Sequence, residues 1–123
     1  MSKYVHRFHT AVSVLAGHGH IKQRLVQSYE DSLAFIDDDL MPSVLRQSFA
    51  DLRRMMSQVD PLNGEGPICA SVRKMSIEEA DECAHRIIDL YGDMVRLSDS
   101  AKEHLPLHVE DKPTNTPVLV KAN

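Results

Sequence analysis

Apolar residues recur at steps of three and four along four stretches of this chain, the spacing of one helical face. This spacing predicts helices over residues 3–16, 21–37, 42–59 and 76–99. Most of the connections between these stretches are short, so we expect an all-α fold, an antiparallel bundle of about four helices over residues 1–104. Residues 105–123 contain three prolines, which disrupt helices, and are expected to form an extended or disordered tail.

The apolar residues along one face of each predicted helix form a stripe, and these stripes also predict which side chains form the core. The third stretch repeats its apolar residues in steps of four and three, as a helix does when it packs against another at a shallow angle. The residues expected to be buried are Leu25, Leu45, Phe49, Leu52, Ile87 and Tyr91.

The clearest start signal is at Ser76. Ser76 followed by Glu79 fits a capping box, in which each side chain bonds the other residue's backbone N–H. We therefore expect the last helix to begin directly after Ser76.

Composition excludes several classes of protein. Hydrophobic residues make up 42% and charged residues 26% of the 123 residues, which is typical of a globular domain. No apolar run approaches the roughly 20 residues that a membrane span needs, so no membrane association is expected. Residues 10–17 are apolar but short for a signal peptide and continue a helical pattern, which favours a cytoplasmic domain.

Charge is distributed unevenly along the chain. Residues 1–29 hold four basic residues and no acid, whereas the whole chain has a net charge of −4. A basic arm for nucleic acid is one interpretation. We favour the other, in which this segment packs among acidic neighbours, because nucleic-acid binders usually carry a dense basic patch. No nucleic-acid partner is expected.

The connection over residues 60–75 is long for a helix–helix loop, and long loops are often functional. Within it, only Ile68–Val72 resembles a strand. Two cations close to a helix N-terminus could bind an anion or phosphate. The candidate ligand-binding residues are Arg73, Lys74, Ser76 and Glu65. The alternative is a structural crossover in which Arg73 and Lys74 pair with the acids of the next helix.

Metal and catalytic motifs are weak. Four histidines, His6, His9, His18 and His20, lie close together in sequence, and whether they bind metal stays open. Glu82 and His85 form one ExxH step, but a di-iron bundle site needs a second one and further glutamates. Neither GxSxG nor HExxH occurs, and we expect no metal, no cofactor and no catalytic residues.

Two functional hypotheses follow. The first is a non-catalytic protein-interaction or regulatory module, and the second is a small-ligand or anion-binding protein, conceivably an enzyme, that uses residues 60–76. A homodimer is also predicted, because the apolar stripes are widened by Met55, Ile88 and Val95 beyond what one buried face requires. The competing explanation is that the C-terminal tail folds back over its own bundle and covers these side chains within one chain.

Overall fold

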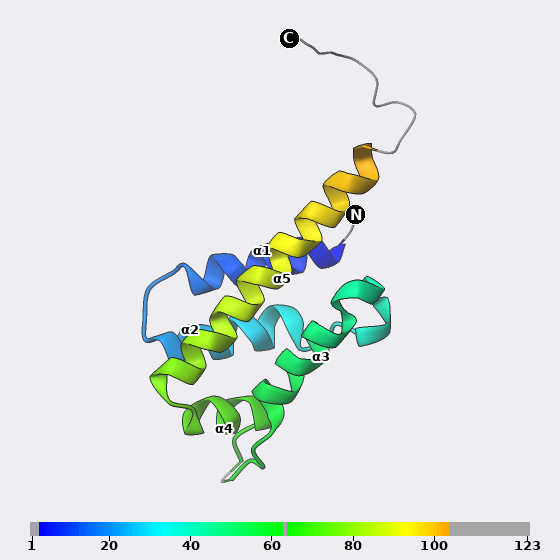
Figure 1. Cartoon of the computed structure of the whole chain (residues 1–123). Helices are drawn as coiled ribbons and strands as arrows, with labels where there is room; N and C mark the ends of the chain where they lie inside the picture. Colours follow the sequence, from blue (N-terminus) through cyan, green and yellow to red (C-terminus); the bar gives the residue numbers. More distant parts are fainter. Residues whose placement is uncertain (1–2, 63, 104–123) are drawn as a thin grey trace.

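In the computed structural model, residues 3–62 and 64–103 are described, and within these ranges the chain forms five α-helices and no strand (Figure 1). The all-α prediction is confirmed. The helices are α1 (Lys3–Leu15), α2 (Ile21–Ser28), α3 (Ser43–Ser57), α4 (Pro67–Lys74) and α5 (Ile77–Glu103). A π-helical turn, Tyr29–Leu33, continues α2, and a 3-10 turn, Asp38–Leu40, precedes α3. The predicted tail lies outside the described residues.

The long helix α5 packs against α1, α2 and α3, while α4 packs against α2 and α3. Figure 1 shows α5 crossing α1 and extending past the other helices at its C-terminal end. Phe8 of α1 and Phe49 of α3 meet edge to face, with ring centroids 5.9 Å apart. This contact joins the first and third helices inside the core.

The predicted core residues are buried with one exception. Leu25, Leu45, Phe49, Leu52 and Ile87 are buried. Tyr91 is only partly buried, because it lies at the flank of α5, where its ring meets that of His9 at 5.9 Å. Ile77, the first residue of α5, is half exposed because it stands in the first turn of that helix.

The helix start at Ser76 is confirmed. The Ser76 N–H donates to Glu79 Oε1 at 2.8 Å, and the Glu79 N–H donates to Ser76 Oγ at 3.0 Å. These are the two reciprocal bonds of a capping box.

The prediction of a strand-like segment at Ile68–Val72 is wrong, because these residues lie in α4. Pro67 occupies the first turn, where a proline's missing N–H costs nothing. Ala70, Ser71 and Val72 turn inward and are buried, and Ser71 Oγ accepts the Val59 N–H at 3.0 Å. Packing against α2 and α3 therefore overrides the β propensity of Ile68 and Val72.

The second predicted helix also differs from the structure. Its α-helical part ends at Ser28, and the chain continues in a π turn in which the Ala34 N–H donates to the Tyr29 carbonyl at 2.9 Å. Apolar residues of this segment repeat at every fourth position. Because a regular α-helix has about 3.6 residues per turn, residues spaced by four would move gradually away from one face of it. The wider turn keeps Leu25, Tyr29 and Leu33 all buried.

Two cations of the basic N-terminal segment cap helices. The Arg24 guanidinium donates to the Leu15 carbonyl at 2.5 Å and to the Gly19 carbonyl at 2.9 Å, at the end of α1. Lys22 Nζ donates to the Arg73 carbonyl at 3.2 Å, at the end of α4. Both charges thus lie where the helix dipole favours them. None of the helices in the described ranges is long and apolar enough to cross a membrane.

Candidate functional site

The structure brings two of the predicted ligand residues together. Arg73 Nε donates to Glu65 Oε1 at 3.1 Å, and Arg73 Nη2 donates to Glu65 Oε2 at 2.7 Å. The hydrogen bond from Arg73 is the largest cause that holds the pKa of Glu65 below its usual value. Arg73 thus pairs with Glu65, and not with the acids at the start of α5.

The other two predicted ligand residues lie apart from this pair. Lys74 is exposed in the last turn of α4, at the end of a helix where carbonyls face outward. The Ser76 hydroxyl is bonded to the Glu79 N–H, so the capping box occupies it. An anion at this position would have to compete with Glu65 for Arg73 and with the capping box for the backbone.

The histidines of the N-terminal segment have separate surroundings. His20 Nδ1 accepts the Lys22 N–H at 3.1 Å and caps the start of α2, whereas His9 contacts Tyr91. Within residues 3–62 and 64–103, no three His, Cys, Asp or Glu side chains are placed to hold a metal ion.

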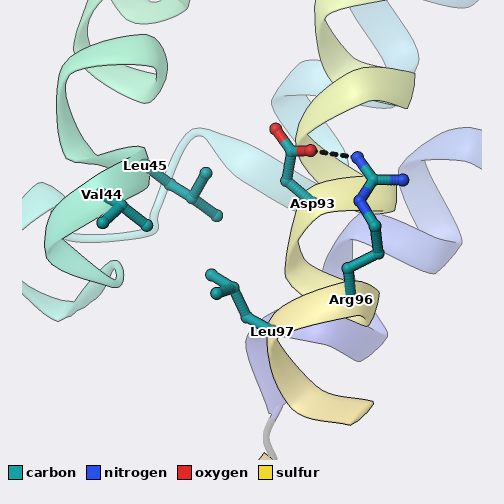
Figure 2. Close-up of a pocket in the computed structure, with 5 residues that line it drawn as sticks. All are labelled: Val44, Leu45, Asp93, Arg96 and Leu97. Atoms are coloured by element: carbon teal, nitrogen blue, oxygen red, sulfur yellow. Dashed lines mark hydrogen bonds and ion pairs between the residues drawn. The ribbon is translucent and has the colours of Figure 1, made fainter. Parts of the chain in front are cut away.

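A groove lies between α3 and α5 on the surface of the described residues. Its apolar end is a hollow of about 240 Å³ lined by Val44, Leu45, Asp93, Arg96 and Leu97. Figure 2 shows Val44 and Leu45 projecting from α3 and Leu97 from α5 around this hollow. Leu45 is buried, but Val44 is 73% exposed and Leu97 37% exposed. Two large aliphatic side chains therefore remain in contact with water at the mouth of the hollow.

The groove continues toward the N-terminus of α5 as a charged end of about 350 Å³. This end is lined by Ser48, Glu82, Arg86, Asp89, Leu90 and Asp93, so that Asp93 belongs to both ends. We call the two hollows together the α3–α5 groove.

Most charges in the α3–α5 groove are neutralised by neighbours. Arg86 Nε pairs with Glu82 at 3.1 Å, and Arg96 pairs with Asp93 (Figure 2). Asp89 has no ion-pair or hydrogen-bond partner among the residues that the structure describes. The charged end thus keeps one carboxylate free for a cation.

Asp51 of α3 adds to the acidity beside the groove. Gln47 Nε2 donates to Asp51 Oδ1 at 2.9 Å, and this bond is the largest cause that lowers the pKa of Asp51. Arg54, and then Arg86 from α5, lower that pKa further. Asp51 is therefore ionised at neutral pH, and Arg86 on α5 acts electrostatically on this residue of α3.

No protein-family model, curated protein or solved structure matches this chain. What the chain can do is therefore argued from the chemistry of its own surfaces.

Sequence reasoning missed the α3–α5 groove. Its walls are rows of residues next to the buried stripes, and the angle at which two helices cross decides whether such rows leave a hollow. The available signal was Val44, an apolar residue that precedes the stripe of α3 and does not belong to it.

Proposed function

We propose that this chain is a non-catalytic protein-interaction module that binds a partner polypeptide in the α3–α5 groove. The observation that carries the proposal is the pair of exposed aliphatic side chains, Val44 and Leu97, around a hollow that adjoins an unpaired carboxylate, Asp89. An apolar centre with a polar rim is the usual anatomy of a protein–protein interface.

The shape of the apolar end favours a polypeptide side chain. This end, about 240 Å³, lies below the roughly 300–1,000 Å³ of typical ligand pockets, whereas the charged end, about 350 Å³, lies within that range. The apolar end is open on one side and suits insertion of an aliphatic side chain. The partner segment should therefore carry an aliphatic residue, with a Lys or Arg nearby to face Asp89.

The alternatives have less support. Of the three residues that widen the stripes, Met55 and Val95 are partly buried within the chain, and Ile88 is 43% exposed. A second copy in the groove, which would make a homodimer, is therefore an outcome of the test. Anion binding at residues 60–76 is the alternative function, and it requires Glu65 to release Arg73.

The test is selection of short random peptides displayed on phage against the full chain. Enriched peptides should share an aliphatic residue followed closely by Lys or Arg. Their binding should be lost in Val44→Glu and in Asp89→Lys. Phe35→Ser is the matched control, because it removes an 81% exposed apolar side chain that does not line the groove.

Selected peptides that bind Val44→Glu as tightly as the native chain would refute the groove as the contact surface. A chain mass of two subunits in sedimentation that falls to one in Val44→Glu would identify a second copy as the occupant instead.

A further inference from the structure

We infer that residues 118–121 of this chain, Val-Leu-Val-Lys, occupy the α3–α5 groove of the same molecule and compete there with the partner polypeptide. This inference rests on the proposed function, since it assigns the regulation of the same surface. It follows from the chemistry of the groove, the order of its two ends, and the length of chain that follows α5.

The side chains of residues 118–121 match the chemistry of the groove. The groove offers exposed Val44 and Leu97 at one end and the unpaired Asp89 at the other. Residues 118–121 supply three aliphatic side chains followed by one cation. Leu119 can cover the aliphatic pair, and Lys121 can pair with Asp89. Burying these aliphatic surfaces against each other is favourable, because it removes them from water.

The order of the two ends also matches. The apolar end includes Leu97 and lies nearer the end of α5 at Glu103, whereas Asp89 lies further back along the helix. A chain that leaves α5 and turns back meets the apolar end first and the acid second. Residues 118–121 present their side chains in that same order, aliphatic and then basic.

The connecting chain is long enough. From Glu103 back to Asp89, the helical rise amounts to about 21 Å. The residues between Glu103 and Val118 can span up to roughly 50 Å when extended. A short tether keeps its ends together at an effective concentration in the millimolar range, so even a weak contact within one molecule is favoured.

The other apolar segment after α5 fits less well. Residues 105–109, Leu-Pro-Leu-His-Val, follow α5 almost at once and would have to reverse around Pro106. They are followed by Glu110 and Asp111, which would be repelled by Asp89. Residues 118–121 are therefore the better occupant.

The test measures how tightly full-chain variants bind a fluorescent peptide of residues 114–123, by anisotropy. The native chain should bind it weakly, because its own segment competes. The double variant Leu119→Ser/Lys121→Glu should bind it at least about tenfold more tightly, since the tethered competitor is lost. The matched control is Leu107→Ser/Lys112→Glu, which makes the same changes elsewhere in the tail and should bind like the native chain.

A charge reversal identifies the contact. Asp89→Lys, added to a Leu119→Ser/Lys121→Ser chain whose own residue 121 is uncharged, should weaken binding of the native peptide. A peptide that itself carries Lys121→Glu should regain affinity for that triple variant. Recovery by the opposite charge would not occur if Asp89→Lys merely disturbed the fold.

The two proposals fail separately. If Leu119→Ser/Lys121→Glu binds the peptide no more tightly than the native chain, while phage-selected peptides still bind and are sensitive to Val44→Glu, the inference is wrong and the proposed function stands. If the peptide of residues 114–123 binds the groove and no unrelated sequence does, the proposed function is wrong, and of the inference only the occupancy of the groove by the chain's own segment stands. The native chain should bind the peptide weakly at every protein concentration. If this weakening disappears when the protein is diluted, the competing segment comes from a second molecule, and occupancy within one molecule is wrong.

Discussion

The carboxylate of Glu65 and the guanidinium of Arg73 form an ion pair with two hydrogen bonds, which ties the connection between α3 and α4 to the last turn of α4. Both residues belong to the ligand site predicted from sequence. The structural alternative expected Arg73 to pair with the acids of the next helix, but its guanidinium is held by an acid of the connection that precedes α4.

Replacing Arg73 with Gln should raise the pKa of Glu65 toward its ordinary value. The hydrogen bond from Arg73 is the largest cause of the lowered pKa, and Lys74 makes the smallest contribution. Lys74→Gln should therefore change it much less. Carboxyl-carbon NMR titration measures both variants.

The lowered pKa of Glu65 determines how the stability of the fold changes with pH. Because the folded pKa of Glu65 is lowered, the pair stabilises the fold above the ordinary carboxyl pKa, and this stabilisation is lost as pH falls through the folded value. Equal shifts in the pKa of Glu65 in the two variants would mean that Glu65 responds only to the general positive charge around it.

Anion binding at the same place is tested by titrating inorganic phosphate into Glu65→Gln. This variant should bind phosphate more tightly than the native chain if Arg73 is the ligand.

Leu52→Ala should lower the free energy of unfolding by about 2–5 kcal/mol, because Leu52 is fully buried and its removal leaves a cavity. Val44→Ala, on the exposed side of the same helix, should change it by less than about 0.5 kcal/mol. Urea denaturation of the three proteins gives the comparison. Similar values for the two variants would contradict the orientation of α3.

Ser76→Ala should cost about 1 kcal/mol of stability, because the Glu79 N–H loses its acceptor. Amide exchange should quicken at residues 78 and 79 and stay unchanged in the middle of α5. Ser57→Ala is the control, since its hydroxyl bonds only the Arg53 carbonyl in the preceding turn. Unchanged exchange at residue 79 would show that the capping box contributes nothing.

The two thiols should differ in reactivity toward a disulfide reagent at pH about 8, because a thiol reacts as its thiolate. Cys83 is fully buried, and burial raises its pKa to about 11, so it should react only on unfolding. Cys69 is partly exposed and should react first, although burial and then the nearby Glu30, 3.8 Å from Sγ, raise its pKa. Glu30→Gln should speed the reaction of Cys69, and Cys69→Ala should remove it.

The raised pKa of Cys83 also predicts an alkaline limit. A group whose folded pKa is raised stabilises the fold below its ordinary pKa, about 8.5 for a thiol, and that stabilisation is lost as pH rises toward about 11. Cys83→Ala should therefore show a smaller fall in melting temperature over this range. An identical fall would assign the alkaline limit to other groups.

The sequence predicted α1, α3 and α5, and it predicted α2 together with the π turn that continues it, because each of these segments carries a continuous apolar stripe. It did not predict α4, since eight residues give too short a window for periodicity and Ile68 and Val72 favour strands. Gly66–Pro67 before the helix and Arg73–Lys74 in its last turn were the usable signals.

The candidate site was harder to predict than the fold. Glu65 and Arg73 were identified, but their mutual pairing depends on how α4 orients Arg73, which no spacing rule supplies. The α3–α5 groove requires the relative placement of residues more than forty positions apart, such as Val44 and Leu97. Local patterns carry no information on such a distance.

The π turn at Tyr29–Leu33 determines how the chain tolerates changes in its own length. Such a turn holds one residue more than an α-helical path between the same neighbours. Losing one residue there would leave a regular helix with both flanking segments facing as before. A loss in α3 would instead rotate every later side chain of that helix by about 100°. Residues 29–33 are thus where this helix can be shortened by one position while Leu25 and Ile36 stay in the core.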